Sequence, residues 1–272
     1  MSLFEKQLAF QILTPCTLNC KLCGDYSPLY RKKGERYFVS YENFCREVEE
    51  VFKIYDFIED ITITGGEPLM HPQLPEITAF VLEHFPDRFK TCRIFTNGTL
   101  LPSSELIEQI KRCEKDNFQM VIDSYGELSF KAQEIAAALT TAQISCRINN
   151  YYGDQQYCGG WIDYGPLDKF RNYSQKDLKM QISRCHNANW KNLIVFKGML
   201  FLCCQAAFGY DLKYFSLHSN EYINLFDSSV SIDCKREIAA QLGTVPLTAC
   251  QYCNGFDIQN SLRFPAAEQV SD

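Results

Sequence analysis

The sequence lacks several features that would assign it to a class at once. Its longest apolar stretch, residues 193–208, is interrupted by Lys197 and Gly198 and falls short of the ~20 residues that a membrane helix requires. No basic region followed by an apolar stretch stands at the start, so no secretory signal is visible. The net charge is −6 and no basic run exceeds residues 31–33, which argues against nucleic acid as the main partner. We therefore expect a cytoplasmic protein with no membrane segment and no nucleic-acid partner.

What is present is the composition of a folded chain with many cysteines. The 272 residues are 46% hydrophobic and 22% charged, which fits a compact domain with a smaller appendage and excludes disorder as the main state. Fourteen cysteines are fewer than a disulfide scaffold of this length would carry, and their spacing is uneven. In a reducing compartment, such clusters indicate metal ligation.

Up to about residue 150, apolar β-rich runs alternate with helical stretches, which is the pattern of parallel β/α units. One helix is expected after Ser40, which can serve as its N-cap. Five repeats are too few for a closed eight-fold barrel, so we predict an α/β fold with a partial (β/α)6 TIM-like barrel and a sixth strand near residues 160–180. The predicted strands are 8–13, 60–64, 92–96, 118–122 and 144–148, and the further helices are about 72–84, 103–113 and 129–139.

The pattern changes after residue 180. Two short β-like runs, residues 192–196 and 199–204, flank Lys197-Gly198 and predict a β-hairpin with a two-residue turn. Residues 210–250 are polar, aromatic and irregular, and they receive no assignment. We expect two domains, a core over residues 1–180 and a small C-terminal extension over residues 181–272 that contains the hairpin.

The first candidate site is a loop with three cysteines directly after the first predicted strand. Cys16, Cys20 and Cys23 follow a C-x3-C-x2-C spacing. A 4Fe–4S cluster needs four ligands, so three thiolates from one loop leave one iron open for chemistry. Zinc is the main competitor, although it usually takes a fourth Cys or His, and the closest histidine in sequence is His71. Incidental cysteines are the remaining alternative.

A second motif follows the second predicted strand, where residues 64–68 read Thr-Gly-Gly-Glu-Pro. Two glycines, Gly65 and Gly66, let the backbone approach a ligand closely, and the Glu67 carboxylate can complement an ammonium group. A plain strand-to-helix turn is the alternative interpretation. The motif lies one β/α unit after the cysteine loop, and this position favours a ligand-binding role over a plain turn.

The two motifs together resemble the radical S-adenosylmethionine (radical SAM) superfamily, over roughly residues 8–150. The resemblance implies that S-adenosylmethionine binds the open iron through its amino and carboxylate groups. An electron from the cluster then cleaves the sulfonium bond, and the resulting 5′-deoxyadenosyl radical removes a hydrogen atom from an unactivated carbon. In this family the Gly-Gly-Glu-Pro turn holds the amino group of the methionine moiety. The residue before the third cysteine packs against adenine; it is often aromatic in the family and is Leu22 here.

Further polar residues stand at the ends of the later predicted strands and would rim the C-terminal mouth of the sheet. By the same resemblance, Ser124 and its neighbours could bind the ribose hydroxyls or the carboxylate of the cofactor, whereas simple turn residues are the alternative. The candidate cofactor-binding residues are therefore Leu22, Gly65, Gly66, Glu67, Pro68, Asn97, Ser124, Arg147 and Asn149.

Cysteines recur after residue 180 in the pattern C-x12-G-x4-C, followed much later by C-x2-C. This pattern resembles the twitch domain, a truncated SPASM extension, and the resemblance implies one auxiliary 4Fe–4S cluster. Four thiolates would close the coordination sphere, which makes the site an electron relay or a structural staple; zinc held by the same thiolates is the alternative. The pattern consists of Cys185, Gly198, Cys203, Cys250 and Cys253.

The choice between two adjacent cysteines rests on strand geometry. Neighbouring strand residues face opposite ways, so we prefer Cys203 as the ligand, with Cys204 as the fallback and Cys234 as a possible replacement. Cys158, in a predicted loop near the mouth of the sheet, is a candidate catalytic residue that could donate a hydrogen atom. The remaining cysteines are interpreted as small apolar core residues: Cys45, Cys92, Cys113 and Cys146.

The expected function is a radical SAM enzyme that abstracts hydrogen from a small polar metabolite of the sugar, cyclitol or nucleoside type, with oxidation, epimerisation or rearrangement as the outcome. The auxiliary cluster would accept the second electron of an oxidation, and a reductant such as flavodoxin or ferredoxin is the expected partner. Because the first strand begins within ten residues of the start, no leader-peptide recognition domain is expected. The alternatives are a peptide- or protein-modifying maturase with a separate recognition protein, and a non-enzymatic zinc or iron–sulfur protein.

Overall fold

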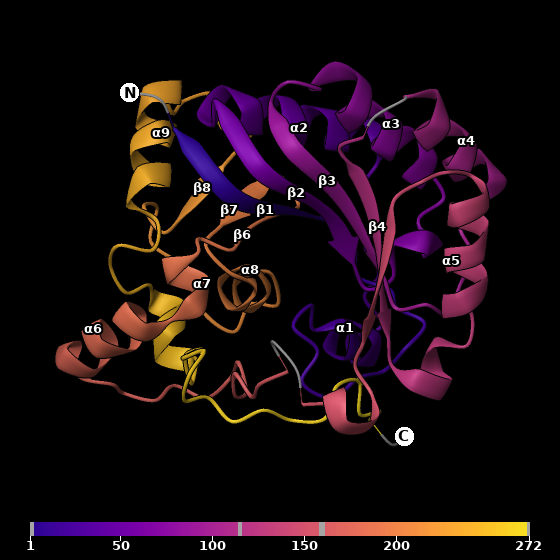
Figure 1. Ribbon diagram of the computed structural model, residues 1–272. Coiled ribbons are helices and arrows are strands. Elements are labelled where there is room, and N and C mark those ends of the chain that lie inside the picture. Colours follow the sequence, from indigo (N-terminus) through magenta and orange to yellow (C-terminus); the bar gives the residue numbers. More distant parts are fainter. Residues whose placement is uncertain (1–2, 114–115, 158–160, 271–272) are drawn as a thin grey trace.

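A single curved sheet of eight strands, in the order β5-β4-β3-β2-β1-β6-β7-β8, organises the chain in the computed structural model (Figure 1). The structure describes residues 3–113, 116–157 and 161–270. Within these residues, no helix is long and apolar enough to cross a membrane.

The first five strands are parallel and are separated by helices, as the sequence predicts. The four helices that follow α1 lie along the outer side of these strands (Figure 1). Ser40 and Ser103 cap two of these helices, because their side chains accept the backbone N–H groups of Asn43 and Leu106. The elements are β1 (Phe4–Leu13), α1 (Ser27–Lys33), α2 (Tyr41–Ile54), β2 (Phe57–Gly65), α3 (Leu74–His84), β3 (Phe89–Thr96), α4 (Ser104–Arg112), β4 (Phe118–Ser124), α5 (Ala132–Thr141) and β5 (Cys146–Asn150).

The sixth parallel strand is β6 (Leu193–Phe196), which pairs with the free side of β1 through Leu8 and Leu193. The prediction of a sixth strand near residues 160–180 is therefore wrong. Residues 161–174 form no helix or strand, and α6 (Gln175–Arg184) follows them. The physical reason is burial: all four residues of β6 are buried, whereas more than half of residues 161–180 are exposed.

The predicted hairpin is confirmed. β6 and β7 (Met199–Phe201) are antiparallel, and Phe196 pairs with Met199 across a two-residue turn. Lys197 and Gly198 both adopt positive φ, 51° and 75°, which is the backbone that such a turn requires. The prediction of an α/β fold with a partial barrel and a C-terminal hairpin thus agrees with the structure.

The chain after the hairpin adds one short strand and several helices to this side of the sheet. α9 lies beside α2, where Arg236 forms an ion pair of 2.7 Å with Asp56. Because β6 hydrogen-bonds to β1, the sheet continues across residue 180, and the division into domains 1–180 and 181–272 stays a prediction. After the hairpin come α8 (Cys204–Asp211), β8 (Tyr222–Asn224) and α9 (Ile232–Gln241). The remaining elements of the chain are α7 (His186–Asn189), before the hairpin, and 3₁₀ turns at Pro68–Met70, Gly126–Ser129, Gly153–Gln155 and Thr248–Tyr252.

The core lies between the sheet and its outer helices and is almost wholly apolar, as with Phe10, Phe44 and Ile61. Buried polar residues gather instead at the carboxyl ends of the parallel strands. A buried polar group costs free energy when it lacks a hydrogen-bond partner. The concentration of such groups here indicates that this edge of the sheet has a function other than core packing. These residues include Gln11, Thr14, Glu67, Thr96, Asn97 and Ser124.

Candidate functional site

The loop after β1 brings Cys16, Cys20 and Cys23 together. All three belong to one small apolar cluster around Leu18 and Ala267. Burial raises the pKa of the Cys16 thiol to about 12, and it also raises the pKa of the Cys20 and Cys23 thiols. A bound cation offsets such desolvation and favours thiolates, so this donor set fits a metal centre.

Side chains from other elements fix the shape of this loop. The Arg31 guanidinium, on α1, donates to the carbonyl oxygens of Cys16 (2.5 Å) and Leu18 (3.1 Å). From the end of β3, Asn97 Nδ2 donates to Thr17 Oγ1 at 3.0 Å and lies 3.5 Å from Cys16 Sγ. Asn97, which the sequence suggested for the cofactor, therefore contacts the cysteine loop in this structure.

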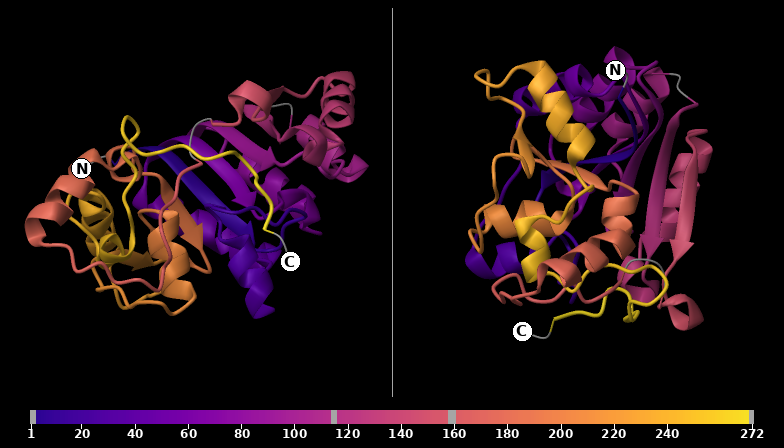
Figure 2. Two further views of the ribbon diagram at one scale, coloured as in Figure 1. Left: turned by 90° about the horizontal axis from the view of Figure 1, so that it is seen from below. Right: turned by 90° about the vertical axis from the view of Figure 1, so that its left-hand side faces the viewer.

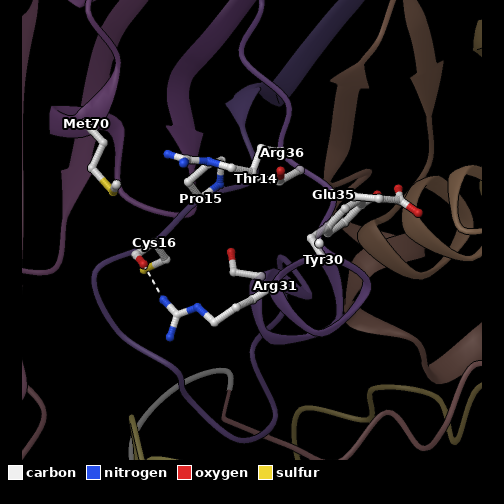
Figure 3. Close-up of a pocket in the computed structure, with 10 residues that line it drawn as sticks. Thr14, Pro15, Cys16, Tyr30, Arg31, Glu35, Arg36 and Met70 are labelled. Carbon is white, nitrogen blue, oxygen red and sulfur yellow. Dashed lines mark hydrogen bonds between the residues drawn. The ribbon is translucent and has the colours of Figure 1, made fainter.

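A pocket of about 300 Å³ lies beside Cys16, between the cysteine loop, α1 and the turn after β2 (Figure 3). Met70 stands on one side of it and Glu35 on the other, and Arg31 reaches toward the backbone of Cys16 (Figure 3). The sequence analysis did not single out Met70 or Arg31. Arg31 lies in a helix and Met70 in a turn, and neither position belongs to a recognisable sequence motif.

The two glycines of the Gly-Gly-Glu-Pro turn have a packing role at this junction, and their contact with the cofactor stays a prediction. A Cβ atom on Gly66 would lie 2.0 Å from the carbonyl oxygen of Pro15, and one on Gly65 would lie 2.7 Å from that of Leu13. The backbone N–H groups of Gly66 and Glu67 donate to Leu13 and Pro15 at 3.2 and 3.0 Å. The glycines therefore allow the end of β2 to press against the end of β1, next to the cysteine loop.

Glu67 is completely buried and already engaged. Its Oε1 accepts the backbone N–H of Leu69 at 3.0 Å and its Oε2 accepts that of Asn97 at 2.8 Å. Burial raises the pKa of its carboxyl to about 7, against the opposing effect of these hydrogen bonds. In this structure Glu67 joins the ends of β2 and β3, and a carboxylate retains further lone pairs for a ligand.

The remaining predicted cofactor residues occupy the same edge of the sheet. Ser124 is buried at the end of β4, and Arg147 is exposed on β5. Asn149 donates to Asp123 Oδ1 at 2.8 Å, and burial raises the pKa of the Asp123 carboxyl to about 6. Leu22, in the cysteine loop, has a positive φ of 54°, and Pro68 begins a 3₁₀ turn, so both shape the backbone around the site.

The second set of cysteines lines one small cavity of about 30 Å³. Cys185 ends α6, Cys203 precedes α8, and Cys250 and Cys253 belong to the 3₁₀ turn Thr248–Tyr252 and its C-cap. Three separate segments thus converge on this cavity, with Tyr164 completing one wall.

Cys203 lines this cavity, and Cys204 is absent from its lining. The reason is not the strand alternation that the sequence analysis assumed, because β7 ends at Phe201 and neither cysteine lies in a strand. Cys203 is the N-cap of α8 and Cys204 is the first residue of that helix, where its Sγ lies 3.3 Å from Gln205 Oε1. Cys234 is exposed on α9.

Among the other cysteines, Cys92 and Cys113 are buried and Cys45 and Cys146 are partly buried, which agrees with a packing role. No described cysteine forms a disulfide. Cys158 lies outside the described residues.

One buried hydrogen-bond donor in the second cavity has no partner within the described part of the chain. Gln205 is only 2% exposed and lines the cavity, and its Nε2 has no hydrogen-bond partner among the described residues. Sulfur atoms of a cluster accept such N–H groups.

Comparison with protein families identifies the first part of the chain. Residues 11–143 match the model of the radical SAM superfamily. This range runs from β1 to the end of α5 and contains both the cysteine loop and the Gly-Gly-Glu-Pro turn. Residues 11–143, just under half of the chain, therefore match a radical SAM domain.

Comparison with solved structures extends the similarity of fold to the second part. BtrN in complex with AdoMet and 2-DOIA is 12% identical and aligns with 97% of this chain and 98% of its own, with a TM-score of 0.56. Native anSMEcpe with bound AdoMet is 11% identical over 87% of this chain and 82% of its own, with a TM-score of 0.52. Streptococcus suis SuiB bound to S-adenosylmethionine is 18% identical, with a TM-score of 0.44; the match covers 57% of this chain and 36% of SuiB.

Proposed function

We propose that this protein cleaves S-adenosylmethionine reductively and abstracts a hydrogen atom from a small polar metabolite of the sugar, cyclitol or nucleoside type, leading to its oxidation or epimerisation. The observation that carries the proposal is the meeting of Cys16, Cys20 and Cys23 in one cluster at the carboxyl edge of a parallel sheet. This edge lies within the matched domain and holds several buried polar residues, such as Glu67, Asn97 and Ser124.

The residues at this edge would have different roles in holding the catalytic cluster. Cys16, Cys20 and Cys23 would hold three irons of the catalytic cluster, and Cys20 is buried while the other two are partly buried. When bound, that cluster supplies one electron to S-adenosylmethionine through its open iron. Arg31 and Asn97 hold the loop in shape through hydrogen bonds to its backbone and to Thr17.

The second cavity supports an auxiliary 4Fe–4S cluster held by Cys185, Cys203, Cys250 and Cys253. Four thiolates leave no open iron, so this site suits electron transfer and does not bind substrate. An oxidation of the substrate by two electrons requires an acceptor for the second one. Tyr26, which follows the cysteine loop, lies near Cys203 and Cys253, so the second cavity is close to the first site at this residue.

The class of substrate is supported by the pocket at the end of β5. This pocket has a volume of about 530 Å³, and its lining offers the side chains of Asn149, Asn150, Asp154 and Gln155 together with two tyrosines. Amides and a carboxylate are suitable partners for the hydroxyl groups of a sugar or cyclitol. BtrN, whose fold this chain shares over nearly its full length, was solved with AdoMet and 2-DOIA.

Anaerobic assays with reconstituted protein test the proposal. The triple variant Cys16→Ala, Cys20→Ala, Cys23→Ala should lose cleavage of S-adenosylmethionine to 5′-deoxyadenosine, because no ligands for the catalytic cluster remain. Cys234→Ala is the matched control, since Cys234 is exposed and lines neither site, and it should keep the activity. Persistent cleavage by the triple variant would refute the assignment.

The mass of the product separates the reaction types. With sugars, cyclitols and nucleosides as candidate substrates, a product lighter by two hydrogens identifies an oxidation, and an unchanged mass identifies an epimerisation or rearrangement. Turnover of a peptide, with no turnover of these metabolites, would instead establish the peptide-modifying alternative.

A further inference from the structure

The chain near its C-terminal end returns to the cysteine loop, far from the helices that precede it. In Figures 1 and 2 the yellow trace leaves the region of α6 and α9 and crosses the molecule to the side where α1 lies. The contact is a short antiparallel bridge between Cys20 and Gln269. Two backbone hydrogen bonds flank it, from Lys21 to Glu268 (2.6 Å) and from Val270 to Asn19 (2.7 Å).

The side chain of Gln269 makes three hydrogen bonds in this bridge. Its Oε1 accepts the backbone N–H of Asn19 at 2.8 Å, and its Nε2 donates to the carbonyl oxygen of Ala267 at 2.7 Å and to Cys20 Sγ at 3.2 Å. The orientation of the amide follows from this network, because a backbone N–H requires an oxygen and a carbonyl requires an N–H. One N–H of the amide is therefore left to point at the sulfur.

The hydrogen bond from Gln269 to Cys20 Sγ lies in a buried environment. Cys20 is only 8% exposed, and Ala267, at 1% exposed, packs against it and Leu18. In such a place water does not compete for the sulfur, and a hydrogen bond to a charged acceptor is stronger than in solvent. The segment that carries Gln269 also shields the sulfur that it contacts.

We propose that Gln269 is a positioning residue that raises the reduction potential of the cluster held by Cys16, Cys20 and Cys23, through its N–H···S hydrogen bond to Cys20. The inference rests on the proposed function, since it requires a cluster at these cysteines. Reduction adds one negative charge to the cluster, and part of this charge resides on the sulfurs. A donor to Cys20 Sγ stabilises the reduced form more than the oxidised form, so the cluster accepts its electron more easily.

Two substitutions remove the N–H donor to Cys20, and they differ in whether an acceptor oxygen remains at position 269. Gln269→Met keeps the length of the side chain and removes both the donor and the acceptor. Gln269→Glu keeps an oxygen for the Asn19 N–H, replaces the donor by a second oxygen and adds a negative charge. Glu268→Gln is the matched control, because it removes only the exposed ion pair with Lys21 and leaves the amide of Gln269 in place.

The experiment is an anaerobic redox titration followed by electron paramagnetic resonance, with iron and sulfide measured on each sample. The catalytic cluster is identified as the one whose signal changes when S-adenosylmethionine is added. We expect Gln269→Met to lower the equilibrium constant for one-electron reduction about tenfold, a shift of about 59 mV to more negative potential. Gln269→Glu should shift the reduction potential further in the same direction. The reduction potential of Glu268→Gln should equal that of the unchanged protein.

The inference is overturned if both Gln269 variants titrate with the unchanged protein at full iron content, or if Glu268→Gln shifts the potential as much as they do. Loss of the cluster from both Gln269 variants also overturns it, because a residue that only tunes the potential is not needed to hold the irons. These results leave the proposed function standing. Absence of any signal sensitive to S-adenosylmethionine in the unchanged protein would instead overturn both.

Discussion

Replacing Gly66 by alanine tests how the turn after β2 supports the cysteine loop. The added Cβ would lie 2.0 Å from the Pro15 carbonyl oxygen and 2.7 Å from that of Thr14. Both contacts are to backbone, so no flexible side chain can move aside. The ends of β1 and β2 must separate, and the cysteine loop begins directly after Pro15.

The cost can be worked out from the contacts that are lost. The N–H groups of Gly66 and Glu67 donate across this junction, and each such hydrogen bond contributes about 1 kcal/mol net. Overpacking adds about 1–3 kcal/mol, and the lower entropy of an unfolded chain with alanine offsets about 0.5–1 kcal/mol. The free energy of unfolding should therefore fall by about 3 kcal/mol, which corresponds to a Tm lower by about 6–12 °C for a chain of this size.

Urea unfolding of the iron-free protein, followed by circular dichroism, measures this loss, and iron uptake on reconstitution measures its effect on the loop. Gly24→Ala is the matched control, because Gly24 lies in the cysteine loop and a Cβ there would meet nothing within 4 Å. We expect Gly66→Ala to be destabilised and to take up less iron, and Gly24→Ala to resemble the unchanged protein in stability. Equal stability of the two variants would refute the reasoning.

Two further predictions concern a buried carboxyl and the second cavity. Glu47 accepts the N–H of Gly198 at 2.7 Å, and burial raises the pKa of its carboxyl from 4.5 to about 8. Because the unfolded chain releases this proton at a lower pH than the folded one, the contribution of Glu47 to stability is greatest below pH 4.5 and falls by roughly 1.4 kcal/mol per pH unit until about pH 8. Glu47→Gln should remove this slope in urea titrations at several pH values, and parallel curves for the two proteins would contradict it. The double variant Cys250→Ala, Cys253→Ala should bind roughly four irons per chain where the unchanged protein binds roughly eight, and it should still cleave S-adenosylmethionine; an unchanged iron content would exclude these residues as ligands.

The sequence alone determined the elements of the fold and the place of its principal motif. The five β/α units, the cap at Ser40 and the hairpin turn at Lys197-Gly198 depend on residues only a few positions apart. Periodicity, capping and turn geometry act over such short distances, so they can be followed along the chain. The cysteine spacing is local in the same sense, and residues 11–143, which contain it, match the radical SAM model that it resembles.

Only the tertiary structure decided which distant segments meet. It placed β6 on the free edge of β1, where the sequence had suggested residues 160–180, and it assigned Gly65 and Gly66 to the junction between β1 and β2. It also brought Gln269 to Cys20 across 249 positions of sequence. Such contacts depend on which buried surfaces fit together once all elements are present. No local pattern encodes that fit, because neither side chain carries a signal of its partner until the chain has folded.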